Sequence, residues 1–310
     1  MFVDVSATKY HSRFGGLWID RKDWRETLSA KRLPDHLQLL IEQFVEDGFI
    51  ILPGAADLAT VDAFQSRIEQ GFRKGNPALF YQNHGSGETH SLDKPVDRLG
   101  TRVVDSFAAL KEALDLFTSP RLLEFLNAIF AEDPLLFQSL SFDQGSQQGL
   151  HQDTAYVVVD KPLQLAACWI ALEDVKPGSG ELIYAPGSHR LPDWVFGGGR
   201  KHWDVEADGH APHDEFSARL RTFAAESPKG LSRFFAKKGD ILVWHADLAH
   251  GGVEIEDRSF TRQSLVGHFC PQSARPRYFD HGSCRSAVRR HGRLAYSSMY
   301  YDLGDLRRRG

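Results

Sequence analysis

Five short segments in the second half of the chain constrain its fold more than any other feature. Each is rich in β-forming side chains and bounded by Gly, Pro or Asp, and they span residues 135–142, 164–172, 181–185, 240–244 and 263–269. No regularly spaced helices separate them. The pattern therefore favours an antiparallel β-sandwich or barrel over a doubly wound parallel sheet.

The first half of the chain shows helical periodicity instead. Residues 37–45 place apolar side chains at helical spacing, and Gly48 follows where a glycine commonly ends a helix. A second helix is predicted from Asp57 to Phe72. A third is predicted to open at Ser119-Pro120, with the serine as N-cap and the proline in the first turn.

Length and composition predict one elaborated domain over residues 1–310. Hydrophobic residues make up 42% of the chain and charged residues 25%, which are ordinary globular values. We expect a helical front over about 30–132 and a β core over about 133–275. A polar excursion at 191–238 interrupts the core, and such an excursion usually covers a site. The remaining tail, 276–310, is expected to pack its tyrosines back on the core.

Charge and cysteine content exclude several functional classes. The chain has 37 basic and 41 acidic side chains, so it has no overall attraction to nucleic acid or to an anionic membrane. Its longest mostly apolar run, Leu163 to Leu172, is half of what a bilayer span needs. The first twenty residues carry charges and do not resemble a secretory leader. Cys168, Cys270 and Cys284 lack CxxC spacing, which predicts reduced thiols and a cytoplasmic protein. Oligomeric state has no signature in the sequence.

The triplet His151-Gln152-Asp153 is the first candidate metal site. On a strand, residues i and i+2 project from the same face about 7 Å apart, so the imidazole and the carboxylate can bind one ion. His250 follows the strand-like run 241–244 and supplies a third ligand if the core is a sandwich. Two histidines and one carboxylate leave coordination positions open, which suits Fe(II) with oxygen and a bidentate organic acid. Zinc hydrolases also use three protein ligands, so the metal stays open.

A second His-x-Asp triplet, His245-Ala246-Asp247, competes with the first. Its distal histidine would have to be His268, twenty-one residues beyond Asp247. That interval has room for one hairpin and not for the several strands that separate ligands in a sandwich. We therefore interpret His245 and Asp247 as structural residues, or as residues that support the metal ligands.

An arginine follows the candidate ligands at the start of a predicted strand. Counting by two places Arg262, Ser264 and His268 on one face of that strand. A guanidinium offers a planar fork for a carboxylate, so Arg262 is the candidate for binding an organic acid beside the metal. Arg258 is the alternative for the same task, and a surface ion pair is the structural interpretation of Arg262.

With these residues in place, the chain resembles the phytanoyl-CoA dioxygenase family of Fe(II)- and 2-oxoglutarate-dependent oxygenases. The similarity runs from about residue 35 to 270, and its order and spacing are more specific than any single motif. It includes the segments 44–54, 151–153, 169–174, 180–182, 186–189, 239–240, 250–251 and Arg262.

The resemblance implies a fold and a set of roles. The family fold is a double-stranded β-helix, a cupin-like jelly roll with a mainly β core, which agrees with the strand pattern. By resemblance, His151, Asp153 and His250 match the iron ligands. Arg262 matches the residue that binds the distal carboxylate of 2-oxoglutarate, and Trp169 matches an aromatic side chain beside it.

Two departures from the family pattern concern the cosubstrate. The interval from His250 to Arg262 is one residue longer than usual, which keeps Arg258 open. Gly252 stands where family members often have a serine that helps to hold 2-oxoglutarate, and Ser264 or Gln148 are candidates to replace it.

The resemblance implies an Fe(II)- and 2-oxoglutarate-dependent dioxygenase that uses O2 to hydroxylate a small organic molecule, releasing succinate and CO2. Asp153 occupies the position that is a small residue in the family's halogenases, which disfavours halogenation. The substrate itself, whether acyl-CoA, amino acid, sugar or secondary metabolite, has no sequence signature. A non-catalytic metal-binding β-sandwich module is the alternative, and a zinc hydrolase is a weaker one.

Residues near the candidate site have two interpretations each. Tyr156, three residues after Asp153, either lines the substrate pocket or packs in the core. His202 and His213 lie in the polar excursion, where exposure to solvent is a more common role for histidine than contact with a substrate.

Overall fold

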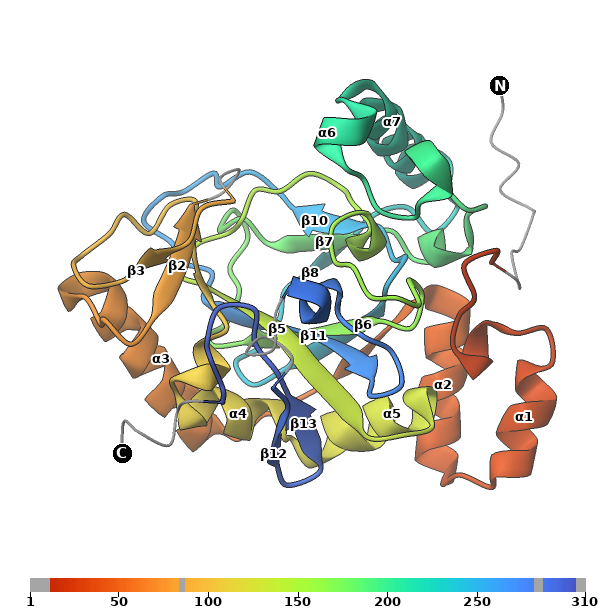
Figure 1. Ribbon diagram of the computed structural model, residues 1–310, viewed down its shortest axis with the longest axis horizontal. Helices are drawn as coiled ribbons and strands as arrows, with labels where there is room; N and C mark the ends of the chain where they lie inside the picture. Colours follow the sequence, from red (N-terminus) through yellow and green to blue (C-terminus); the bar gives the residue numbers. More distant parts are fainter. Residues whose placement is uncertain (1–11, 84–86, 282–286, 305–310) are drawn as a thin grey trace.

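The computed structural model describes residues 12–83, 87–281 and 287–304. Two antiparallel sheets face each other at its centre (Figure 1). The major sheet contains, in spatial order, β1 (Phe49–Leu52), β9 (Ile241–His245), β6 (Ala166–Ala171), β11 (Ser264–Pro271), β5 (Pro134–Phe142), β4 (Thr101–Val104), β2 (Phe80–Asn83) and β3 (His90–Ser91). The minor sheet contains β10 (His250–Gly252), β7 (Leu182–Tyr184) and β8 (Ser232–Phe234). This arrangement agrees with the predicted jelly roll.

A small hairpin from the end of the chain extends the major sheet. It consists of β12 (Arg289–His291) and β13 (Leu294–Tyr296), and β13 pairs with β5 in parallel. Beyond it, the Tyr301 hydroxyl donates to Ala78 O and accepts from the backbone N–H of Phe80. The tail therefore packs back on the core, as its aromatic residues predicted.

Helices cover one face of the major sheet and one end of the minor sheet (Figure 1). The first group is α1 (Trp24–Lys31), α2 (Asp35–Asp47), α3 (Leu58–Lys74), α4 (Lys111–Phe117) and α5 (Pro120–Phe130). The second group is α6 (Val205–Asp208) and α7 (Ala211–Glu226), both within the polar excursion. No helix in the described ranges is long and apolar enough to cross a membrane.

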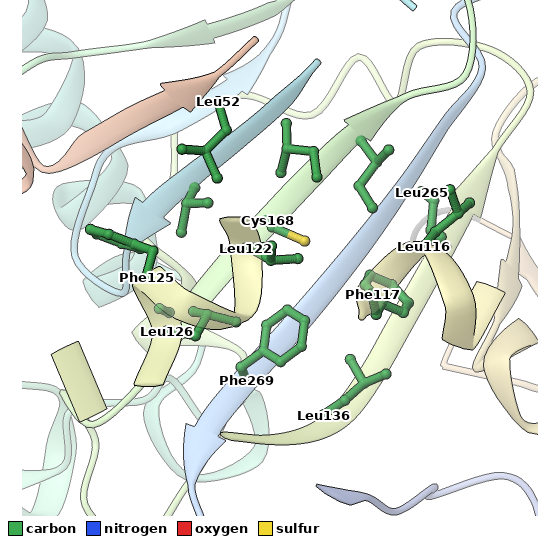
Figure 2. Close-up of a cluster of buried hydrophobic side chains, with 14 of the residues drawn as sticks. Leu52, Leu116, Phe117, Leu122, Phe125, Leu126, Leu136, Cys168, Leu265 and Phe269 are labelled. Carbon is green, nitrogen blue, oxygen red and sulfur yellow. The ribbon is translucent and has the colours of Figure 1, made fainter. Parts of the chain in front are cut away.

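The alternation of side chains along each strand divides the core in two. On the outer face of the sheet, Figure 2 shows helices α4 and α5 packed against strands β5, β6 and β11 through a group of buried apolar side chains that includes Leu116, Phe117, Leu122, Phe125, Leu126, Leu136, Cys168, Leu265 and Phe269. The inner face packs Trp169, Trp244 and Val266 against Leu182 and Tyr184 of the minor sheet. Helices cover the outer face of the major sheet, so the space available for a site lies between the two sheets.

The predicted helices and strands are present, with one local difference at the start of α5. Gly48 ends α2 with φ +82°, and a side chain there would meet the His189 ring, because a Cβ atom on Gly48 would lie 2.5 Å from His189 Nδ1. Pro120 begins α5, but Ser119 does not cap it, because its hydroxyl donates to Ala55 O instead. The short extended run predicted at Phe49–Leu52 is present as β1. The front also contributes β2, β3 and β4 to the sheet, and the excursion contains α7. These four elements were not predicted.

A buried carboxyl group ties the tail to the core. Asp105 is fully buried, where it accepts hydrogen bonds from the backbone N–H of Ser139 (2.7 Å) and the hydroxyl of Ser298 (2.6 Å). Burial raises the pKa of Asp105 to about 7, against the lowering effect of these hydrogen bonds. The protonated form is therefore the one that the folded protein favours.

This raised pKa predicts how stability depends on pH. Below about pH 4 Asp105 is protonated in both the folded and unfolded states, and its contribution is fully present. As the pH rises to about 7, the contribution is lost, because the unfolded chain ionises freely and the folded chain does not. We expect Asp105→Asn to gain about 3 kcal/mol relative to the wild type between pH 4 and pH 7, measured by urea unfolding. Parallel pH profiles would contradict this assignment.

Candidate metal centre

A backbone bridge brings the two histidines together. His151 and His250 exchange both backbone hydrogen bonds at 2.9 Å, outside the regular ladders, and their ring centroids lie 4.3 Å apart. His250 is the first residue of β10, so the bridge extends the edge of the minor sheet. The segment after β5 therefore runs directly beside β10.

Asp153 reaches the same point in a different way from the one predicted. It is the first residue of a 3-10 turn, Asp153–Ala155, and does not continue a strand from His151. The turn directs its carboxylate back to the histidines: Oδ1 lies 3.9 Å from His151 Nε2 and 3.6 Å from His250 Nε2. All three side chains are buried, and their ligand atoms lie within 4.8 Å of one another.

Backbone carbonyl groups fix the tautomer of both histidines. His151 Nδ1 lies 2.9 Å from Gly149 O, and His250 Nδ1 lies 3.0 Å from Leu248 O. A carbonyl oxygen only accepts, so each Nδ1 must carry the proton and each Nε2 keeps its lone pair. Burial and the neighbouring His250 lower the pKa of His151 to about 3, which keeps it neutral at physiological pH. Metal-binding histidines have this arrangement.

The second carboxylate oxygen of Asp153, Oδ2, lies beside two residues of the major sheet. Trp244 donates its indole N–H to Oδ2 at 2.7 Å, and His268 Nε2 lies 3.6 Å from the same oxygen. Burial raises the pKa of Asp153, but the imidazoles of His250 and His268 lower it by more, so it lies below its ordinary value. The side chain is thus a carboxylate with one oxygen held by the protein and one directed at the histidines.

The second His-x-Asp triplet, His245-Ala246-Asp247, is not part of the group of candidate ligands. His245 Nε2 is 3.1 Å from Asp20 Oδ1, which directs the ring away from the three candidate ligands. Asp247 accepts from Lys201 Nζ (2.8 Å) and from the Thr154 hydroxyl (2.6 Å), while its carbonyl accepts from Gln152 Nε2 (2.6 Å). Asp247 therefore anchors the loop that carries Asp153 to the excursion.

The predicted cosubstrate residues lie beside the candidate ligands. Arg262, Trp169 and Gln148 line the same cavity of about 70 Å³ as the three ligands. The guanidinium of Arg262 is 5.5 Å from the centre of the Trp169 ring, and its Nε has no hydrogen-bond partner in the described residues. Burial lowers the pKa of Arg262 to about 10, although Glu173 and Glu181 raise it, so it remains charged at neutral pH.

The other two predicted residues have different surroundings. Ser264 is fully buried, and its hydroxyl also lacks a partner in the described part of the chain. It lies on the same face of the chain as Arg262 but is not part of the cavity wall. Arg258 is exposed and lies outside the cavity.

Comparison with known proteins decides the family. The family model described as phytanoyl-CoA dioxygenase matches residues 44–256, more than two thirds of the chain. The chain belongs to the phytanoyl-CoA dioxygenase family. The peroxisomal phytanoyl-CoA dioxygenase of Homo sapiens is 24% identical over 265 residues, covering 79% of this chain and 72% of the human protein.

Solved structures share the fold of this family member. The epimerase SnoN, solved with Fe3+, alpha ketoglutarate and nogalamycin RO, has a TM-score of 0.61 at 19% identity, covering 85% of this chain and 99% of SnoN. EctD from S. alaskensis, in its apoform, has a TM-score of 0.53 at 18% identity, covering 83% and 86% of the two chains. Membership of the phytanoyl-CoA dioxygenase family confirms the predicted activity class, an Fe(II)- and 2-oxoglutarate-dependent dioxygenase. The human relative is peroxisomal, and a cytoplasmic location for this chain stays a prediction.

Sequence reasoning missed three residues of this candidate site. Trp244, Lys201 and Ser146 support or line it, but no local motif marks them. Trp244 has one signal in retrospect: it lies two residues from Leu242 on a strand, so the two share the inner face. Lys201 and Ser146 meet the site only through the folded chain.

The buried ion pair of Lys201 with Asp247 predicts that the excursion contributes to the stability of the fold. Removing its charge in Lys201→Met leaves Asp247 buried without its cation, and we expect a loss of about 3 kcal/mol in the free energy of unfolding. Lys229→Met is the matched control, because Lys229 forms a comparable ion pair with Asp47 in a partly exposed position. That variant should lose less than about 1 kcal/mol. Equal losses in the two variants, measured by urea unfolding, would refute the anchoring role.

Proposed function

We propose that His151, Asp153 and His250 hold Fe(II), that Arg262 binds the distal carboxylate of 2-oxoglutarate, and that the enzyme hydroxylates a small organic molecule with O2. Succinate and CO2 would be the accompanying products. The observation that supports this most strongly is the pair of Nε2 lone pairs, each fixed by a backbone carbonyl, facing one carboxylate oxygen.

The three candidate ligands fit ferrous iron. Two neutral imidazoles and one carboxylate form a set of mixed hardness, which is typical of non-haem Fe(II) sites with open positions for other ligands. Because Trp244 holds Oδ2, Asp153 would bind through Oδ1 alone. Three protein ligands would leave coordination positions open for a bidentate organic acid and oxygen.

Arg262 fits an organic carboxylate. A buried guanidinium with an unused Nε costs free energy unless an anion joins it. Its positive charge survives burial, and its planar fork matches a carboxylate in geometry. The ring of Trp169 lies beside it and excludes water from the contact. Arg258, which is exposed, has none of these features.

Ser146 is a candidate for the hydroxyl that the family usually supplies after the distal histidine. A Cβ atom on Gly252 would lie 3.3 Å from Ser146 Oγ and 3.3 Å from the backbone nitrogen of Gln147. Ser146 therefore fills the space that a serine at position 252 would need, and it lines the cavity. Gln148 also lines the cavity, whereas Ser264 is not one of the residues that form its wall.

The protein would contribute to the reaction by positioning the reacting groups and by excluding water. Iron and 2-oxoglutarate supply the oxidising chemistry when they are bound. The backbone bridge sets the spacing of the two imidazoles, and Trp244 and His268 orient the carboxylate. Arg262 fixes the cosubstrate at its far end, while the apolar inner faces of the two sheets keep water out.

Removing the carboxylate ligand tests the iron site. Asp153→Ala should abolish succinate formation from 2-oxoglutarate and O2, because only the two imidazoles remain. Under anaerobic conditions it should also lose the weak visible charge-transfer band that Fe(II) and 2-oxoglutarate produce together. The exposed Asp257→Ala is the control and should retain both signals. Wild-type turnover in Asp153→Ala would overturn the ligand assignment, and a wild type that binds iron without the band would indicate a non-catalytic module.

A matched pair of arginine variants tests the cosubstrate site. Arg262→Met should raise the dissociation constant for 2-oxoglutarate by about thirtyfold or more, because a buried charged hydrogen-bond pair is lost. Arg258→Met should leave it within about twofold, since that side chain is exposed. The measurement is anaerobic titration of the charge-transfer band in the Fe(II)-loaded proteins. The reverse ranking would assign the cosubstrate to Arg258.

A further inference from the structure

A second cavity lies next to the candidate metal centre. It has a volume of about 300 Å³, against about 70 Å³ for the first. Its wall combines apolar side chains, two tyrosines, one amide and one arginine, contributed by Phe137, Gln138, Tyr156, Val157, Val158, Arg277, Tyr278 and Met299. The size is that of a site for a small organic molecule.

Two contacts join this cavity to the metal centre. The Tyr156 ring meets the His151 ring edge-on, with centroids 5.7 Å apart. Gln138 of β5 pairs directly with His268 of β11, whose Nε2 lies 3.6 Å from Asp153. A molecule in the second cavity would therefore lie beside the candidate metal centre, on the side of Tyr156 and His151.

The polar groups of the cavity differ in whether their hydrogen-bonding atoms are already bonded to the protein. The Tyr278 hydroxyl is already bonded to Phe137 O (3.0 Å) and to the Ser297 hydroxyl (2.6 Å). The Tyr156 hydroxyl lies 2.6 Å from His213 Nε2. Both phenols are thus occupied by the protein, and the guanidinium is the main group with spare donors.

Arg277 has no acidic partner in the described residues. Its side chain is exposed, and its one hydrogen-bond contact there is with His202 Nε2 at 3.2 Å. A guanidinium offers five N–H donors, so most remain available. No aspartate or glutamate lies among the residues that form the cavity wall. Among the described residues, Arg277 is therefore the one charged side chain of a cavity wall that combines polar and apolar groups.

The excursion reaches both polar ends of this cavity. His202 contacts Arg277, and His213 of α7 contacts Tyr156. These histidines, expected to be solvated, instead join the segment 191–238 to the cavity wall. A ligand bound here would therefore lie close to the excursion, which contacts the cavity wall at Tyr156 and Arg277.

We propose that the primary substrate is a small molecule with an apolar body and an anionic group, carboxylate or phosphate, and that Arg277 binds this group. The inference rests on the proposed function, because it places the substrate beside that metal site. The apolar part would lie on Phe137, Val157, Val158 and Met299. The guanidinium would then orient the molecule so that its carbon skeleton faces the metal centre.

Calorimetric binding to the wild type, saturated with Fe(II) and 2-oxoglutarate without oxygen, tests this inference. Octanoate and octyl phosphate are the anionic probes, and octanamide is their neutral counterpart. We expect both anions to bind at least tenfold more tightly than octanamide. A difference between the two anions assigns the head group as carboxylate or phosphate. Equal affinity for all three probes, or no binding of any, would overturn the proposal.

Two variants test whether Arg277 is responsible for the preference for anionic probes. Arg277→Met should remove the tenfold difference, while Arg275→Met, an exposed arginine two residues away and outside the cavity wall, should retain it. A preference that survives in Arg277→Met would overturn the assignment. So would octanoyl-CoA binding more tightly than octanoate and equally well to Arg277→Met, because its phosphates would then bind elsewhere.

The visible band of the Fe(II) and 2-oxoglutarate complex separates this proposal from the proposed function. If the band forms and the anion preference is absent, the substrate inference fails and the iron site stands. If the band is absent and the preference is present, the cavity binds anions and the proposed function fails.

Discussion

The backbone bridge between His151 and His250 is the interaction on which the site depends. Two hydrogen bonds of 2.9 Å hold residues that are ninety-nine positions apart directly opposite each other. The pairing fixes the distance between the two side chains, and the carbonyls of Gly149 and Leu248 fix which nitrogen of each ring is free. Main-chain atoms therefore set the geometry of the two candidate histidine ligands.

The remaining ligand depends on a second set of contacts. Asp153 leaves the bridge on a 3-10 turn, and the turn is secured by the bonds from Gln152 and Thr154 to Asp247. Lys201 joins Asp247 to the excursion, so the excursion also stabilises the loop that carries Asp153, the third candidate ligand. The buried core of the two sheets supplies a rigid frame for both, which is how enzymes of this type keep their ligands in place.

Much of this arrangement follows from local sequence signals. Alternating side chains marked β5, β6, β9 and β11, and the order of His151, Asp153, His250 and Arg262 identified the chemistry. What could not be predicted depends on contacts between distant residues: strands β2 to β4 of the front, the hydrogen bond from the Trp244 indole to Asp153, and Arg277 beside the second cavity. Even the predicted geometry was partly wrong, because a turn and not a strand directs Asp153 to the histidines.

The most direct measurement is a crystal structure of the protein prepared without oxygen with Fe(II) and 2-oxoglutarate, using anomalous scattering to find the iron. We predict one strong peak about 2.0–2.2 Å from His151 Nε2, His250 Nε2 and Asp153 Oδ1, the bond lengths expected for nitrogen and oxygen ligands. The far carboxylate of 2-oxoglutarate should lie within hydrogen-bond distance of Arg262. A peak bound by other residues, or a cosubstrate held by Arg258, would contradict this prediction.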